Sequence, residues 1–127
     1  MMGYVTIVAM LALIEFVAFG ALVGRTRGRT GVAAPAISGN EEFERYFRVH
    51  QNTLEQLVIF LPALFAFAHF NSAEVAAGVG LLFIIGRVVY LRAYVKDPGS
   101  RTLGFLMGML ANIVLVFGAI IGAVRSL

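Results

Sequence analysis

The chain alternates four long apolar stretches with short polar connections. The apolar stretches run from about Tyr4 to Val23, Thr53 to Phe70, Ala73 to Val95 and Leu103 to Val124. Each comes close to the ~20 residues that a helix needs to span a bilayer. Because the stretches are continuously apolar and lack the period-two alternation of a transmembrane β-barrel, helices are expected. The pattern therefore predicts an all-α integral membrane protein with four spanning helices.

Composition supports a membrane location. The chain has 127 residues, of which 60% are hydrophobic and 13% are charged, whereas soluble domains carry about 25% charged residues. A single soluble core of this size cannot hide so much apolar surface. The first stretch contains Glu15 and has no basic segment before it, so we interpret it as a permanent helix rather than as a signal peptide.

The basic residues are concentrated in two of the polar connections. The net charge is only +3, and its distribution follows the positive-inside rule rather than the pattern of a nucleic-acid-binding surface. The connections after the first and third helices are thus expected to face the cytoplasm, with both termini on the other side, and a bacterial inner membrane is the expected location. The chain has no cysteine, so any thiol chemistry requires a thiol ligand.

Capping and turn residues define the expected helix ends. Asn40 is a good N-cap for the second helix, and Asp97-Pro98-Gly99 is typical of a turn. Pro62 should kink the second helix. We predict one membrane domain, residues 1–127, with helices over about 4–23, 41–70, 73–95 and 102–124.

Glycines recur at spacings of four along the expected fourth helix: Gly104, Gly108, Gly118 and Gly122. Small residues at this spacing let helix backbones approach closely. They predict helix–helix contact, either within the bundle or between subunits.

Polar residues form a stripe on the second helix. Glu44, Arg48, Asn52 and Glu55 fall within an arc of about 80° on one helix face. Gln51 lies at the edge of this stripe. Charged residues in a membrane helix normally face the bundle or a wet cavity, and they indicate function by default.

A second stripe lies on the third helix. Arg87, Tyr90 and Tyr94 fall within an arc of about 60°, and Arg101 opens the fourth helix at the same level. Both stripes approach the same membrane boundary, so we expect them to line one cavity.

The residues of this cavity favour a particular ligand chemistry. Guanidinium groups suit carboxylates, Glu55 suits an ammonium group, and Asn52 suits a peptide amide. A ligand with carboxylates, an amino group and peptide bonds would fit. The alternative is structural: Glu44–Arg48, Arg48–Glu55 or Arg87–Glu55 pairs that hold helices in register, with the tyrosines in the interfacial aromatic belt.

Other polar residues lie apart from the stripes. His50 is off the stripe, and His69 has no metal-binding partners at useful spacing, so no metal site is expected. Glu15 is a lone carboxylate deep in the first helix, either neutral or paired with an arginine or with Asn112. Its role stays open.

The pattern ERYFRVHQNTLE resembles the signature of the MAPEG superfamily, membrane-associated proteins in eicosanoid and glutathione metabolism. The resemblance covers nearly the whole chain, including RVVYLRAY and Arg101. Its box consists of Phe43, Glu44, Arg45, Arg48, Asn52 and Glu55.

The resemblance implies a homotrimer of left-handed four-helix bundles with glutathione sites between subunits. Arg27 and His50 match positions offered by the adjacent subunit, although Arg29 is hard to separate from Arg27. Arg87 matches an arginine that supports the site, and Gln56 stands where leukotriene-C-synthase-like members have a tyrosine. The positions that match glutathione-binding residues in those members are Arg48, Asn52, Glu55, Tyr90, Tyr94 and Arg101.

The resemblance implies an enzyme in which Arg101 is the catalytic residue. Its guanidinium would lower the pKa of the glutathione thiol and stabilise the thiolate, and a lipophilic electrophile would enter from the bilayer. The first hypothesis is thus a glutathione transferase, with peroxidase activity as a further option. The alternative is a non-catalytic lipid- or glutathione-binding scaffold. A channel or transporter is disfavoured because the polar stripe stops short of the far face.

Overall fold

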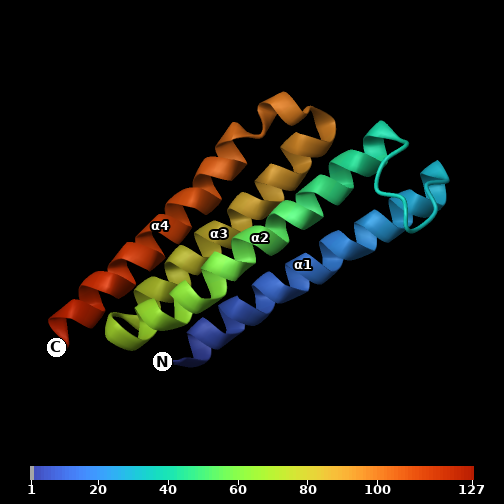
Figure 1. The fold of residues 1–127 in the computed structure, drawn as a ribbon. Coiled ribbons are helices and arrows are strands. Elements are labelled where there is room, and N and C mark those ends of the chain that lie inside the picture. Colours follow the sequence, from blue (N-terminus) through green and yellow to red (C-terminus); the bar gives the residue numbers. More distant parts are fainter. Residues whose placement is uncertain (1) are drawn as a thin grey trace.

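The computed structural model describes residues 2–127 and contains four long helices joined by short connections (Figure 1). All four are long and apolar enough to cross a membrane, so the prediction of an all-helical membrane protein is confirmed. A short 3₁₀ helix, η1, precedes the last helix. The elements are α1 (Met2–Thr30), α2 (Glu41–Phe70), α3 (Ala73–Lys96), η1 (Pro98–Ser100) and α4 (Thr102–Arg125).

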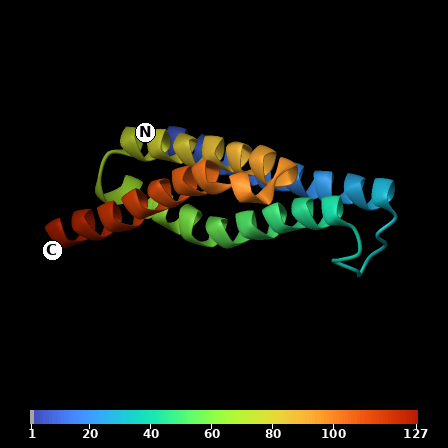
Figure 2. The same cartoon turned by 90° about the horizontal axis from the view of Figure 1, so that it is seen from above.

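The helices run up and down, so both chain ends lie at one end of the bundle (Figure 1). The α1–α2 connection and the α3–α4 turn lie toward the opposite end. Helices α2 and α3 pack against each other, α1 packs against both, and α4 also packs against both. Figure 2 shows the same bundle from above, with α4 lying beside α2 and α3. Two helices thus form the centre and two flank it.

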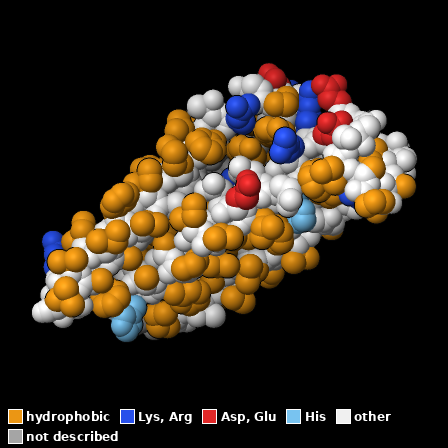
Figure 3. Space-filling model, viewed as in Figure 1, with side chains coloured by type: hydrophobic (Ala, Val, Ile, Leu, Met, Phe, Trp, Pro, Cys, Tyr) orange, Lys and Arg blue, Asp and Glu red, His pale blue; other side chains and the backbone are white. Residues whose placement is uncertain are grey.

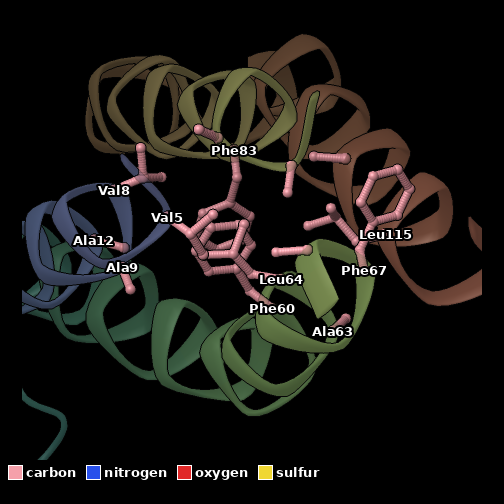
Figure 4. Packing of buried hydrophobic residues seen from close by; sticks show 14 of the residues in the cluster. Val5, Val8, Ala9, Ala12, Phe60, Ala63, Leu64, Phe67, Phe83 and Leu115 are labelled. Carbon is pink, nitrogen blue, oxygen red and sulfur yellow. The ribbon is translucent and has the colours of Figure 1, made fainter. Parts of the chain in front are cut away.

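A core of stacked aromatic and aliphatic side chains holds the helices together near the chain termini (Figure 4). The rings of Phe60 and Phe83 stack with their centroids 4.0 Å apart. Val5, Leu64 and Leu115 are fully buried around them. Many other large apolar side chains remain exposed, as expected for a surface that meets lipid instead of water.

The residues predicted to begin α2 and to form the turn after α3 do so in the structure. The Asn40 side-chain oxygen accepts a hydrogen bond from the Phe43 amide at 3.0 Å, which caps α2. The Asp97 carboxylate accepts one from the Gly99 amide at 3.1 Å, which forms the turn into η1. Helix α2 continues through Pro62. These ends follow from local side-chain hydrogen bonds that the sequence already contains.

Helix α1 is longer than predicted: it ends at Thr30 and not near residue 23. The prediction followed the apolar run alone, whereas a helix can continue into water beyond the membrane. The Thr26 and Thr30 hydroxyls donate back to helix carbonyls at 2.7 Å each. Gly31, with φ of 78°, then ends the helix, and its amide donates to the Arg27 carbonyl at 2.9 Å.

The glycines of α4 make close contacts inside the bundle. A Cβ on Gly104 would collide with the backbone nitrogen of Tyr90 and lie 2.9 Å from the Gly86 carbonyl oxygen. A Cβ on Gly118 would collide with the Phe67 ring, and one on Gly122 would lie 2.6 Å from the Asn71 side chain. The glycine spacing therefore serves packing within one subunit, and at Gly104 the α3 and α4 backbones touch directly.

Replacing Gly104 by alanine should destabilise the bundle by about 1–3 kcal/mol, the usual cost of overpacking a tight site. The new methyl group meets backbone atoms, which cannot rotate away. The melting temperature in detergent measures the loss. Gly78→Ala is the matched control, because nothing lies within 4 Å of its added Cβ. Equal melting temperatures for the two variants would contradict this account of the α3–α4 contact.

Candidate functional site

Charged side chains gather toward the end of the molecule that carries the α1–α2 connection and η1 (Figure 3). A cavity of about 500 Å³ lies in this region, between α2, α3 and the start of α4. Its lining combines part of the α1–α2 connection with most of both stripes predicted from the sequence, but without Glu44 and Arg87. The lining residues are Ile37, Phe47, Arg48, Gln51, Asn52, Glu55, Tyr90, Tyr94 and Arg101.

Three elements bring the polar lining together. Helix α2 presents Arg48, Asn52 and Glu55 from one face, as their spacing predicts. On α3, the rings of Tyr90 and Tyr94 stack with centroids 5.5 Å apart. The turn through η1 returns the chain beside α3. The structure thus places in one cavity all six residues that the resemblance assigns to glutathione binding.

The turn also orients Arg101. Its Nη1 donates to the Pro98 carbonyl oxygen at 3.0 Å. The Ser100 hydroxyl donates to the Ala93 and Asp97 carbonyl oxygens at 3.0 and 2.7 Å, which fastens η1 to the end of α3. The exposed Arg101 guanidinium is therefore held by one carbonyl oxygen of a turn that Ser100 fastens to α3.

The cavity charges do not neutralise one another. Within residues 2–127, the ion pairs join Arg29 to Glu42 at 2.6 Å and Arg45 to Glu41 at 3.1 Å, and none of these residues lines the cavity. The alternative that the stripe residues pair to hold helices in register is therefore not what the structure contains. The exposed Arg48 side chain keeps its charge available to a ligand.

One polar atom in the cavity wall lacks a partner inside the protein. The Asn52 side-chain oxygen is buried and accepts no hydrogen bond from residues 2–127. Leaving a buried oxygen unpaired costs about 1–3 kcal/mol, so a ligand N–H would relieve a real penalty. An unpaired amide oxygen among unpaired guanidinium groups fits an anionic peptide.

Arg87 lies beneath the cavity instead of lining it. Its side chain is 1% exposed, and its Nε and Nη2 atoms donate to the Thr53 hydroxyl oxygen at 3.2 and 2.9 Å. Its guanidinium carbon lies 4.4 Å from the centre of the Tyr90 ring. The Thr53 hydroxyl in turn donates to the Val49 carbonyl at 2.8 Å. Arg87 thus supports the tyrosine that forms the wall.

Arg27 and His50 lie outside this cavity within a single chain. Arg27 donates to the Ala36 carbonyl oxygen at 2.7 Å and stacks over the Phe43 ring at 4.6 Å. The His50 ring stacks on Phe16 with centroids 4.4 Å apart, between α2 and α1. The resemblance assigned both residues to an adjacent subunit, which a single chain does not test.

Two polar residues of the membrane-spanning helices, Asn112 and Glu15, lie outside the cavity. Asn112 donates from its side-chain nitrogen to the Gln56 side-chain oxygen at 3.1 Å, so it pairs with α2 and not with Glu15. Glu15 is buried, and its carboxylate oxygens accept no hydrogen bond from residues 2–127. Gln56 therefore contributes to the contact between α2 and α4 and not to the polar cavity.

Sequence reasoning missed three contributors to the site. Ile37 comes from the α1–α2 connection, whose path no periodicity reveals. Phe47 lines the cavity although it lies beside the polar stripe. Thr53 is fully buried as the acceptor for Arg87. The available signal for Thr53 was a threonine within a polar segment of a helix. Such a hydroxyl can donate a hydrogen bond to the carbonyl of the preceding turn, here Val49, and still accept one from a cationic side chain.

Comparison with known proteins identifies the class of protein that this fold and site define. Residues 4–121 match the model of the MAPEG family. Because the match covers most of the chain, the protein belongs to the MAPEG family.

Three relatives illustrate the range of this similarity. An uncharacterized protein of Synechocystis sp. is 43% identical over 105 residues, which cover 83% of this chain and 77% of the relative. Microsomal glutathione S-transferase 2 of Homo sapiens is 35% identical over 100 residues, covering 77% of this chain and 68% of that protein. Leukotriene C4 synthase of Rattus norvegicus is 34% identical over 94 residues, covering 67% of this chain and 63% of that protein.

Replacing Thr53 by valine should cost about 2 kcal/mol of stability, because it removes the acceptor of two hydrogen bonds from a buried cation. Valine keeps the shape of threonine, so packing changes little. The melting temperature in detergent measures the effect. Thr53→Ser retains the hydroxyl and is the matched control. A serine variant as unstable as the valine variant would mean that the methyl group, and not the hydroxyl, matters at this position.

Proposed function

We propose that this protein is a glutathione-dependent membrane transferase that activates the glutathione thiol for attack on lipophilic electrophiles, with peroxidase activity as a further capacity of the same site. One observation carries the proposal. A cavity at the polar end of a membrane bundle holds arginines and a glutamate that form no ion pair with one another, and a buried amide oxygen that accepts no hydrogen bond from residues 2–127. Relatives named as glutathione S-transferase and leukotriene C4 synthase support it.

Each polar group of the cavity suits one part of the tripeptide. Arg48 offers a planar set of donors for a carboxylate. Glu55 is the acceptor for the α-ammonium group, and the Asn52 oxygen is the acceptor for a peptide N–H. The hydroxyl groups of Tyr90 and Tyr94 supply further donors. Arg87 stabilises this set from below through Thr53 and the Tyr90 ring.

Arg101 is the residue that we assign to thiol activation. Glutathione supplies the thiol, which is mostly protonated at neutral pH when it is free in water. A guanidinium beside the sulfur stabilises the thiolate and lowers the pKa of the thiol. Arg101 is held toward the cavity by its hydrogen bond to Pro98, so it need not reorganise when negative charge develops.

The lipophilic partner would reach the thiolate from the bilayer. An apolar groove of about 330 Å³ lies between α2 and α4, and Phe105 lines both this groove and a second cavity, of about 350 Å³, that includes Asn52, Tyr90 and Arg101. The bilayer concentrates apolar electrophiles beside the groove, and proximity then supplies much of the rate.

We also propose that the functional unit is a homotrimer of left-handed bundles. Large apolar side chains remain exposed on the helices, including Ile14, Val17, Val58 and Phe117, and they provide surfaces for lipid and for neighbouring copies. In such an assembly Arg27 and His50 would complete the site of the adjacent subunit, with Arg29 as the alternative to Arg27. This arrangement accounts for their separation from the cavity of their own chain.

The distribution of positive charge supports an orientation in the membrane. The cavity end carries most of the arginines (Figure 3), so the positive-inside rule places it toward the cytoplasm. We propose that residues 1–127 form one protein domain, which lies in a bacterial inner membrane with the α1–α2 and α3–α4 connections in the cytoplasm. The site would then take glutathione from that compartment.

Replacing Arg101 by alanine should remove the thiolate absorbance that glutathione gains on binding, because the stabilising cation is lost. Ultraviolet difference spectroscopy of the purified protein measures this signal. Arg92→Ala, which removes an exposed arginine of α3 outside the cavity, should keep it. A thiolate signal that survives in Arg101→Ala would exclude Arg101 as the activating residue. Binding without thiolate in the unmodified protein would instead favour a non-catalytic scaffold.

Replacing Glu55 by glutamine should weaken glutathione binding by about tenfold, since a charge-assisted hydrogen bond contributes roughly 1.5–3 kcal/mol and the neutral one that glutamine can still accept contributes roughly 0.5–1.5 kcal/mol. Labelled-glutathione binding measures the affinity, and size-exclusion chromatography checks the assembly. Glu74→Gln is the matched control, because Glu74 lies at the opposite end of the bundle. Unaltered affinity in an intact Glu55→Gln assembly would remove Glu55 from the proposed binding set.

A further inference from the structure

The apolar groove between α2 and α4 contains one polar feature, a pair of amide side chains. Its lining residues are Gln56, Ile59, Phe105, Met109, Asn112, Ile113, Val116 and Phe117. Gln56 and Asn112 are the polar members, and their side chains are joined by a hydrogen bond of 3.1 Å. A polar pair at this depth costs free energy that a purely apolar groove would avoid.

The pair is left incomplete by the protein. Asn112 is 5% exposed, and its side-chain oxygen accepts no hydrogen bond from residues 2–127. The second amide group, on Gln56, uses its oxygen for Asn112 and keeps its nitrogen as a donor. The two amides thus hold one acceptor oxygen, buried on Asn112, and one donor nitrogen, on Gln56, that have no hydrogen-bond partner from residues 2–127. If the oxygen and nitrogen atoms of both side-chain amides were exchanged, the pair would still have one acceptor oxygen and one donor nitrogen without a partner.

A hydroxyl group matches this arrangement, because it donates one hydrogen bond and accepts another. An ether or a carbonyl oxygen could use only the donor, and a plain hydrocarbon chain could use neither. The groove therefore suits an aliphatic chain that carries a hydroxyl group at the level of the pair.

The position of the pair relates it to the thiol site. Gln56 lies one helical turn from Asn52 on α2, about 6 Å along the helix axis. Phe105 lines both the groove and the second cavity, which contains Asn52 and Arg101. A chain whose reactive end lies beside Arg101 would pass the amide pair a few bonds farther along.

We propose that the Gln56–Asn112 pair binds a hydroxyl group on the aliphatic chain of the electrophile, so that the preferred substrates are hydroxylated lipid electrophiles. This inference rests on the proposed transferase function of the adjoining cavity. The pair acts on specificity, since it touches the substrate chain and not the reacting atoms.

The test compares α,β-unsaturated aldehydes of seven, nine and eleven carbons, each with and without a hydroxyl group at the ω carbon. In each reaction the thiol of glutathione loses its proton to solvent, the sulfur bonds to the β-carbon as the alkene electrons shift toward the carbonyl oxygen, and the α-carbon takes up a proton from solvent, so that S and H add across the double bond. The distant hydroxyl leaves this chemistry unchanged. The ratio of kcat/KM for the hydroxylated member of a pair to that for the plain member therefore measures how strongly the groove favours the hydroxyl group.

The ratio should be greatest at the length whose hydroxyl reaches the pair. At that length it should fall about tenfold in Asn112→Leu, the effect of losing roughly 1.4 kcal/mol of hydrogen bonding. Met109→Leu, which alters an apolar residue of the same groove, should leave the ratio unchanged. A ratio that is the same in the unmodified protein and in Asn112→Leu would overturn the inference. If Asn112→Leu also lost the assembly while the ratio stayed the same, the pair would serve contacts between copies instead of substrate binding.

A binding measurement separates this inference from the proposed function. The same aldehyde pairs are added to glutathione-free protein, and the shift of melting temperature is recorded. If neither aldehyde is conjugated, the transferase proposal fails, yet a larger shift with the hydroxylated member that disappears in Asn112→Leu would still support the amide pair. Equal shifts for both members would overturn it.

Discussion

A buried guanidinium group determines how the central helices of this bundle meet. Arg87 is enclosed between α3 and α2, where a cation without partners would cost several kcal/mol. The Thr53 hydroxyl accepts two of its hydrogen bonds, and the Tyr90 ring covers its face. These contacts are satisfied in one register of α2 against α3. The cavity above depends on that register, because the same two helices supply most of its polar wall.

The site combines two environments that rarely adjoin. Toward the polar end of the bundle, Arg48 and Glu55 remain unpaired in a wet cavity. Toward the middle of the bundle, apolar residues of α2 and α4 line a groove. Phe105 lies where the two meet. In the reaction that we propose, a charged peptide and an apolar electrophile differ completely in solvent preference, and this junction would let each approach from the phase that it prefers.

Much of the architecture was predictable because its causes are local. Continuous apolar runs define the spanning helices, Asn40 caps α2, and helical spacing places the stripe residues on one face. The end of α1 was predicted wrongly, since the helix continues into water where apolarity no longer marks it. Ile37 and the Gln56–Asn112 pair were not predictable, because they depend on how a connection folds back and how two helices rotate about their axes. Helical spacing and the resemblance together identified the site residues, whereas the role of Thr53 was missed, because its partner Arg87 lies on a different helix.

The contact of Gly104 with the Tyr90 backbone also sets a limit on how the site can vary. Gly104 lies in the first turn of α4, directly after Arg101, so the arginine is mounted on a helix that rests on the α3 backbone. The separation between the start of α4 and the backbone of α3 at Tyr90 is therefore fixed by main-chain atoms and not by side-chain conformers. Related sequences can alter the chemistry of the cavity one side chain at a time, but they can widen it only by separating a whole pair of helices. The width of the cavity is thus inherited with the fold, while its selectivity is free to diverge.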